Sequence, residues 1–475
     1  MAGDIALEWI DRNARDLVEM SDEIWRLAEI GLREFKSAAL QATALEKAGF
    51  TIEMGVAAMP SAFVATWGKG SPVIALLGEY DSLPRTSQKP VPYRDPLVEG
   101  GAGHACGHNL LGVAAVGAAL ALKEEMESQG IQGTIKYMGC PAEETASGKV
   151  YMVRAGCLDG VDAALTWHSS SLNAVSMLSS LANRSVRFRF HGRTAHAAGN
   201  PEMGRSALDA VELMNIGVNY LREHVPSQAR IHYVITDGGG EPNVVPDLAE
   251  SWYYIRAPKA PQAKEIYERI VRIAKGAAMM TDTEVEVRFF GGCSNVIANL
   301  PLSEALHRNL LKVGPPKFTE EEKAFAKEMA SHFPPGQKEG SLTMLAERGI
   351  DLSPYDLHES VLPLFKDRTA MPGSTDVGDV SWICPTSQFT TACNVIGSAG
   401  HSRQVTATSG MSIGHRGMIQ AAKVLALTAL DALLDPELVE KAKADFQQSL
   451  GKTTYESPVP PEIVEPVDPF QGKSH

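Results

Sequence analysis

Two histidines and a thiol lie within five residues of one another in the stretch 101–108, which reads GAGHACGH. Imidazole and thiolate groups are common ligands of transition metals, so this composition predicts a metal site. The three glycines give the backbone conformations closed to other residues, which would let His104, Cys106 and His108 converge. A glycine-rich turn with a buried thiol is the alternative. Further ligands from other parts of the chain would favour the metal site.

Such ligands follow four short apolar runs, at 73–77, 134–138, 163–167 and 392–396, each typical of a strand buried on both faces. The polar residues beyond these runs are Asp81, Glu143, Glu144, His168 and His401. Taken singly, adjacent glutamates can simply begin a helix, and a histidine after a strand can be a satisfied core residue. In an open parallel sheet, however, ligands bind beyond the carboxyl ends of the strands. We therefore expect these side chains to meet Cys106 and His108 at one edge.

The elements that must position them predict an α/β fold with a mixed, mostly parallel sheet. Helices are expected over 4–32, 37–48 and 110–129, and a further strand over 62–67. Between 183 and 291 the pattern changes to the order βαββαβ, typical of a ferredoxin-like domain, with strands over 185–191, 230–236, 249–256 and 284–290 and helices over 205–221 and 261–278. We expect a discontinuous catalytic domain, 1–182 and 292–475, with this domain inserted. Segment 315–372 has no sheet pattern and is expected to cap the cleft.

Composition narrows the class of protein. A chain of 475 residues predicts two or three domains, and a net charge of -13 argues against a general binder of nucleic acids or membrane surfaces. The six scattered cysteines indicate reduced thiols. Because the start of the chain lacks the basic-then-apolar order of a signal peptide and no run of about 18 apolar residues is evident, we expect a cytoplasmic protein.

Seven motifs together resemble those of the M20 metallopeptidase and amidohydrolase family: GEYDSLP at 78–84, HACGH at 104–108, PAEE at 141–144, WH at 167–168, GRTAHAA at 192–198, PNVVPD at 242–247 and GSAGHS at 397–402. Within its aminoacylase-like branch, GHNLLG at 107–112 and STDVGDVSW at 374–382 are similar to the group of p-aminobenzoyl-glutamate hydrolase B subunits. The resemblance extends from about residue 20 to residue 435. It implies a catalytic domain that holds two zinc or manganese ions and an inserted lid through which subunits dimerise.

The resemblance also implies a role for each matching residue. The metal ligands would be Cys106, His108, Glu144, His168 and His401. Glu143 would be the general base toward a water activated by the metal, and Asp81 would orient a ligand. His196 would reach a partner subunit's active site and stabilise the developing oxyanion. Asn243 and Arg256 would hold the substrate's carboxylate. His104 is left with a structural role.

One departure from the wider family concerns the metal. The first motif there usually reads His-x-Asp and the bridging ligand is an aspartate, whereas this chain has Glu79-Tyr80-Asp81 and Cys106 at these positions. A thiolate in place of a bridging carboxylate leaves the identity of the metal and the filling of the second site open.

The resulting hypothesis is a metal-dependent amidohydrolase that cleaves the amide of N-acyl or N-aroyl amino acids, with p-aminobenzoyl-glutamate as the leading substrate. Other N-acyl or indole-acyl amino acids, or dipeptides, are alternatives within the same chemistry. A cysteine amidase with Cys106 as nucleophile and His108 as base leaves the other ligands unexplained. A non-catalytic metal-binding partner subunit would not need Glu143. A homodimer through the lid is expected, with a heteromer containing a related subunit as the alternative.

Overall fold

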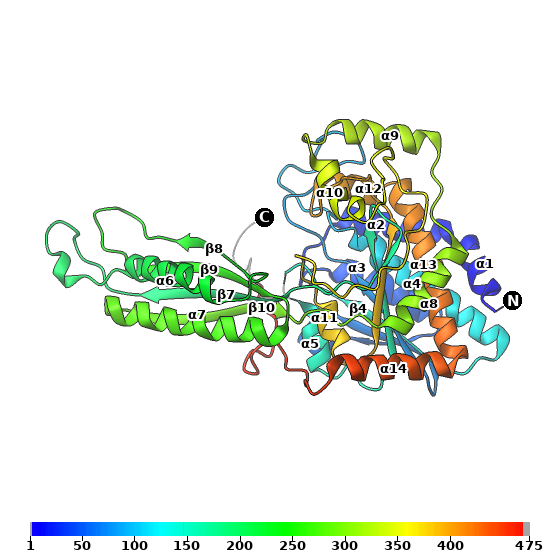
Figure 1. Cartoon of the computed structure of the whole chain (residues 1–475), viewed down its shortest axis with the longest axis horizontal. Helices are drawn as coiled ribbons and strands as arrows, with labels where there is room; N and C mark the ends of the chain where they lie inside the picture. The colour runs from blue at the N-terminus through cyan, green and yellow to red at the C-terminus, as the bar shows by residue number, and fades with distance from the viewer. Residues whose placement is uncertain (1, 146, 469–475) are drawn as a thin grey trace.

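The computed structural model describes residues 2–145 and 147–468, which form a large α/β part and a narrow, elongated part beside it (Figure 1). The large part is built on a seven-stranded sheet in the order β1-β2-β4-β3-β5-β11-β6. Its strands are β1 (Thr51–Met54), β2 (Phe63–Lys69), β3 (Val73–Glu79), β4 (Gly133–Cys140), β5 (Ala163–Ser170), β6 (Ala174–Ser176) and β11 (Thr386–Ala392). The four central strands β4, β3, β5 and β11 are parallel, and the outer strands are antiparallel. The predicted mixed, mostly parallel sheet is confirmed.

Alternate residues of the central strands enter two separate cores, as the period of two requires. Ile74 and Leu76 face the helices of one side, whereas Ala75 and Leu77 face the other. The first layer contains α1 (Asp4–Arg12), α2 (Ala14–Leu27), α3 (Phe35–Lys47), α4 (His108–Gln129), α8 (Leu300–Val313), α13 (Ser412–Leu434) and α14 (Pro436–Leu450). The second contains α5 (Gly148–Arg154) and α11 (Val377–Ser381). Helices therefore cover both faces, so polar side chains at the strand ends have only the rim of the sheet to occupy.

Helices α4 and α13 pack against each other at the centre of the first core. Both are apolar around most of their circumference, as expected of helices enclosed by other elements. By length and composition α13 is apolar enough to cross a membrane, but 72% of its most apolar window is buried inside the molecule. We conclude that α13 is a core helix of the α/β part.

The elongated part is a four-stranded antiparallel sheet in the order β10-β7-β9-β8. Along the chain its elements run β7 (Ala182–His191), α6 (Ala207–Leu221), β8 (Arg230–Asp237), β9 (Leu248–Ala257), α7 (Ala260–Thr281) and β10 (Glu284–Cys293). This is the βαββαβ arrangement of a ferredoxin-like unit. Both helices lie on one side of the sheet (Figure 1). Strand β8 forms an outer edge of this sheet.

The capping segment has two helices, α9 (Glu320–Ser331) and α10 (Gln337–Ala346), which pack over the loops after β11. The remaining elements are α12 (Arg403–Ser409) and three short 3-10 helices, η1 (Val56–Ala58), η2 (Pro201–Met203) and η3 (Arg222–His224). In Figure 1, α9 and α10 lie at the top of the large part, near α12.

Two predictions about single elements were wrong. The helix expected over 4–32 is broken at Asn13, whose side-chain amide donates to the Trp9 carbonyl (2.8 Å) and thereby replaces a continuing helical contact. The strand expected over 392–396 lies earlier, as β11. The apolar residues Val395 and Ile396 instead fill the small cores beneath α9 and α10. An apolar run is buried in either case, so its hydrophobicity alone does not distinguish a strand from a core loop.

Candidate metal centre

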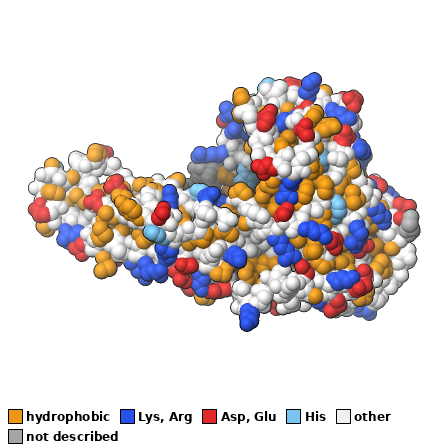
Figure 2. All heavy atoms as spheres, in the orientation of Figure 1, with side chains coloured by type: hydrophobic (Ala, Val, Ile, Leu, Met, Phe, Trp, Pro, Cys, Tyr) orange, Lys and Arg blue, Asp and Glu red, His pale blue; other side chains and the backbone are white. Residues whose placement is uncertain are grey.

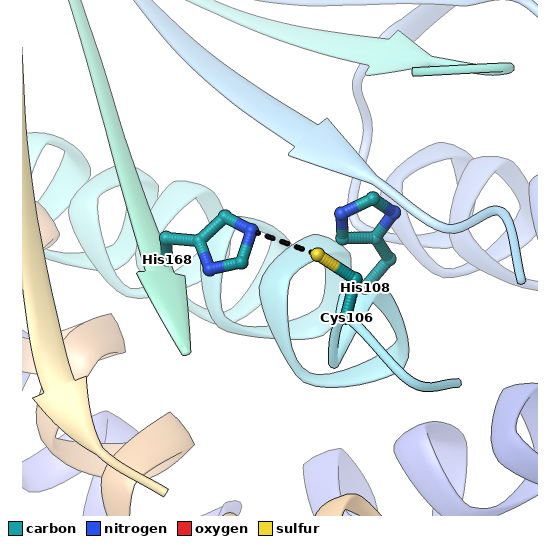
Figure 3. A group of neighbouring side chains, drawn as sticks. All are labelled: Cys106, His108 and His168. Carbon is teal, nitrogen blue, oxygen red and sulfur yellow. Dashed lines mark hydrogen bonds between the residues drawn. The ribbon is translucent and has the colours of Figure 1, made fainter. Parts of the chain in front are cut away.

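Side chains from four separate segments converge at the carboxyl ends of β3, β4 and β5. Two sets of ligand atoms, each lying within 4.8 Å of one another, are Cys106 with His108 and His168, and Cys106 with Glu144 and His401. Figure 3 shows the first set, with the Cys106 thiol between the two rings. All five metal ligands predicted from the sequence are thus brought together, and Cys106 is common to both sets.

The turn before α4 positions Cys106 and His108. Of the three glycines in the motif, only Gly107 has a positive φ, 75°. A Cβ at Gly107 would lie 2.2 Å from Ser169 Oγ, and that hydroxyl donates to the Cys106 carbonyl (2.9 Å). Because the chain turns here against β5, the thiol faces His168 at 3.3 Å and His108 begins the helix. His104 is fully buried and bonds the Ile24 carbonyl instead (3.0 Å), which agrees with its expected structural role.

Hydrogen bonds to the second ring nitrogen leave Nε2 of both buried histidines for a metal. His168 Nδ1 lies 2.8 Å from the Ser169 carbonyl, and His108 Nδ1 lies 2.7 Å from Asp81 Oδ1. The other Asp81 oxygen accepts from the Glu144 backbone amide (2.9 Å). Asp81 therefore holds two of the candidate ligands in place, which is the arrangement that usually orients metal ligands.

The residues present fit a divalent metal. His108 Nε2 and Glu144 Oε1 are buried and lack hydrogen-bond partners within the described part of the chain. Such atoms are costly to bury unless a ligand or an ion satisfies them. His401, on a loop beyond β11, places Nε2 only 3.3 Å from that Glu144 oxygen. One thiol, three imidazoles and a carboxylate form a donor set suited to zinc or manganese.

The electrostatics of this cluster are those of crowded acidic groups. Burial, followed by the charges of Glu79 and Asp376, raises the pKa of Glu143 well above its usual value. Burial and then Glu144 do the same to the pKa of the Cys106 thiol. For His108, burial opposes the charge, but Cys106 and the carboxylates outweigh it and raise the pKa of the ring. The protein alone thus disfavours the negative charges that a bound cation would stabilise.

A buried ion network that sequence reasoning missed lies beneath the cluster. Lys149 Nζ, on α5, is 2.6 Å from Glu79 Oε1 and 2.6 Å from Asp376 Oδ1. Asp376 Oδ2 also accepts from the Lys149 backbone amide (2.9 Å), so Asp376 makes these contacts although it precedes α11. The remaining Glu79 oxygen lies 3.2 Å from His108 Nε2. A lysine between apolar helix residues was the available signal in the sequence.

The cavity that contains the cluster is about 570 Å³ in volume and lies between the two parts of the molecule. Glu143, Glu144 and His401 line one side, and Arg256, with Ser374, lines the other. The Arg256 guanidinium approaches Ser374 Oγ (3.4 Å), while its buried Nε lacks a hydrogen-bond partner among the described residues. A planar guanidinium with an unused edge suits a carboxylate. His232 and Tyr254 add polar groups that were not predicted.

Asn243 and His196 lie elsewhere. Asn243 is exposed in the turn before β9, and its carbonyl accepts from Ala197 (2.9 Å), next to His196. Arg256 is near the opposite end of β9, about 27 Å along the strand at ~3.4 Å per residue. One chain therefore does not place Asn243 beside Arg256, contrary to expectation, because an extended strand separates them. His196 is likewise exposed, with Nδ1 accepting from Gly199 (3.0 Å).

Comparisons with known proteins agree with this geometry. The model of peptidase family M20/M25/M40 matches residues 75–354. The B subunit of p-aminobenzoyl-glutamate hydrolase from Escherichia coli (strain K12) is 42% identical over 464 residues, which cover 96% of each chain. The Xaa-Arg dipeptidase of Mus musculus is 28% identical and covers 94% of this chain and 92% of its own. The crystal structure of the Bacillus subtilis YXEP protein, a dinuclear metal binding peptidase from the M20 family, aligns with a TM-score of 0.56 at 17% identity, covering 89% and 99% of the two chains.

Proposed function

The chain belongs to peptidase family M20/M25/M40, and on this premise we propose that it is a metal-dependent amidohydrolase of N-acyl or N-aroyl amino acids. The leading substrate is p-aminobenzoyl-glutamate, since the relative of that name is 42% identical over nearly the whole chain. The observation that carries the proposal is the position of Cys106 in two overlapping ligand sets, in the same cavity edge as Glu143 and opposite Arg256.

Two divalent ions, zinc or manganese, would be held by Cys106, His108, Glu144, His168 and His401. When bound, such an ion acts as a Lewis acid and lowers the pKa of water to about 7. Glu143 is half-buried at the cavity wall and would take a proton from the attacking water, then pass it to the leaving amine. Asp81 would keep His108 and the Glu144 backbone in register through its two hydrogen bonds.

Arg256 would bind the free carboxylate of the amino acid, which orients the amide toward Glu143. Its guanidinium is positioned by the Pro372 carbonyl and Ser374, each at 3.4 Å, and by Tyr254, whose ring centroid lies 5.7 Å away. These contacts leave Nε for the substrate. A bidentate pair of this kind adds geometric specificity as well as affinity.

A homodimer is part of the proposal, and the elongated part would be its lid and dimerisation domain. Strand β8 is an outer edge of its sheet with Val234 57% exposed, and Tyr220 and Met279 on the neighbouring helices are 76% and 84% exposed. Exposed apolar side chains beside a strand edge are typical of association sites. A partner would then supply His196 and Asn243, which lie far from the chain's own Arg256. A heteromer is the alternative, since the 42% identical relative is named as one subunit of a hydrolase. We propose a cytoplasmic location.

Chelation tests the metal requirement. Dialysis against a chelator should abolish hydrolysis of p-aminobenzoyl-glutamate, and added zinc or manganese should restore it. Glu143→Gln should keep the metal content measured by atomic emission and lose turnover by roughly 100-fold or more, the scale of general-base contributions. Normal turnover in that variant would refute the role of Glu143. A panel that includes indole-acyl amino acids and dipeptides separates the alternatives, of which dipeptides have support in the Xaa-Arg dipeptidase relative.

A cysteine amidase is tested in the same preparation. The Cys106 thiol lies near His168, but burial and Glu144 raise its pKa, so the reactive thiolate is disfavoured in the absence of a metal. Activity that survives chelation and is lost on alkylation would replace the metal mechanism with this one.

A further inference from the structure

A second cavity, of about 580 Å³, lies on the other side of His401. It is formed by the loop that follows β3, the end of α9 and the residues after His401. His401 lines both cavities, so a substrate whose amide lies at Glu144 has room for one arm in each. The cavity of Arg256 would take the amino acid, which leaves this second cavity for the acyl group.

The wall of the second cavity is cationic. Its charged or titratable members are Arg85, Arg94, Arg403, His332 and His401, and no acidic side chain of the described residues lines it. Arg94 pairs with Glu99 at 3.2 Å, but both side chains are more than 60% exposed, so this pair neutralises little. Three guanidiniums in one wall contrast with the chain's net charge of -13. Such a cavity attracts an anion and repels a cation.

Arg403 provides the specific group. Its Nη2 donates to the Arg85 carbonyl (3.3 Å), which holds the guanidinium against the cavity wall. Its Nε is buried and has no hydrogen-bond partner within residues 2–145 and 147–468. A buried donor of this kind is costly unless a ligand meets it, and a carboxylate matches the fork of a guanidinium.

The rest of the wall fits the body of an acyl group. Tyr93 and Met329 lie in the same cavity, beside Val91 and Pro92. An aromatic ring and aliphatic side chains around a few directed polar groups are the usual lining of a small-molecule site. The cavity therefore has an apolar portion for a ring or short chain and a cationic portion for its far end. Lys and Arg side chains gather at the notch between the two parts of the molecule (Figure 2).

We propose that this second cavity is the acyl subsite and that it selects acyl or aroyl groups that carry a carboxylate, with Arg403 as the specificity-determining residue. The inference rests on the proposed amidohydrolase function and refines its substrate class. N-(4-carboxybenzoyl)-L-glutamate should be hydrolysed faster than N-benzoyl-L-glutamate at low concentration, because only the former can meet Arg403.

The first test compares kcat/KM for these two substrates with the metal-loaded full chain. The carboxylated substrate should be favoured by about 10-fold to 100-fold, the range expected for a hydrogen bond to a charged group. Arg403→Met should bring this ratio toward one, Arg403→Lys should restore part of it, and Arg85→Met gives an independent reduction should Arg403→Met fold poorly. Arg15→Met, on the exposed surface of α2, is the control and should leave the ratio unchanged.

A binding measurement separates the two proposals. Calorimetry with metal-loaded Glu143→Gln should show tighter binding of the carboxylated ligand, lost in the double variant with Arg403→Met. If wild type hydrolyses neither substrate but this binding difference holds, the subsite stands and the proposed activity fails. If both are hydrolysed equally, or Arg403→Met lowers both equally, the subsite is overturned and the activity stands.

Discussion

Replacing Lys149 with methionine should destabilise the large part of the molecule strongly. Lys149 is 1% exposed, and its ammonium lies 2.6 Å from both Glu79 and Asp376. Methionine fills a similar volume but leaves two carboxylates buried without their cation. Breaking a buried ion pair by removing one partner costs about 3–5 kcal/mol. For a domain of roughly 370 residues, average unfolding entropies convert this into a fall in melting temperature of about 4–7 °C.

Thermal unfolding of metal-free protein, followed by tryptophan fluorescence, measures this effect. The matched control is Lys123→Met, because Lys123 also lies 2.6 Å from a carboxylate, Glu127, but that carboxylate is 51% exposed. An exposed pair contributes at most about 1 kcal/mol, so the control should change the melting temperature by ~1 °C. A second test is Lys149→Met combined with Asp376→Asn, which should recover part of the loss. Equal melting temperatures for the two lysine variants would refute the reasoning.

Three further predictions concern pH, metal and assembly. Burial raises the pKa of Asp379 to about 7, so between pH ~4 and ~7 the unfolded chain ionises this carboxyl while the folded chain keeps it protonated. Stability should fall with rising pH there, and Asp379→Asn should remove that contribution in urea titrations at both pH values. Metal binding should release the Cys106 proton, detectable as a buffer-dependent heat in calorimetry, and Cys106→Ser should lower metal content. Val234→Arg should convert a dimer to monomers by light scattering; a monomeric wild type would contradict the proposed interface.

Sequence reasoning located the metal cluster because its signal was local and repeated. Three of the four predicted strands of the site were right, since continuous apolar runs such as 73–77 and 163–167 form buried parallel strands. Parallel strands bring their carboxyl ends to one rim, so Asp81, Glu144 and His168 had to be neighbours. The convergence of these side chains with Cys106 followed from topology, without any distance information.

The parts that were missed depend on pairs far apart in the chain. Lys149 and Asp376 are separated by 227 residues, and neither has a local pattern that identifies its partner. The second cavity has the same origin, because Arg85 and Arg403 approach only when the loop after β3 meets α12. Asn243 was placed beside Arg256 because sequence separation is a poor guide along an extended strand.

The charges around Cys106 support a two-metal site. The groups that can carry a negative charge are Glu79, Asp81, Glu143, Glu144, Asp376 and the Cys106 thiol, against the single ammonium of Lys149. Fully ionised, six anions and one cation give a charge of -5. One dication would leave -3 and two would leave -1, which is the smaller burden in a site of low polarity. In the wider family a histidine occupies the position of Glu79, whereas here Glu79 is neutralised by Lys149. A lysine can therefore balance the extra carboxylate without replacing either metal, which leaves His108 as the ligand from this side of the site.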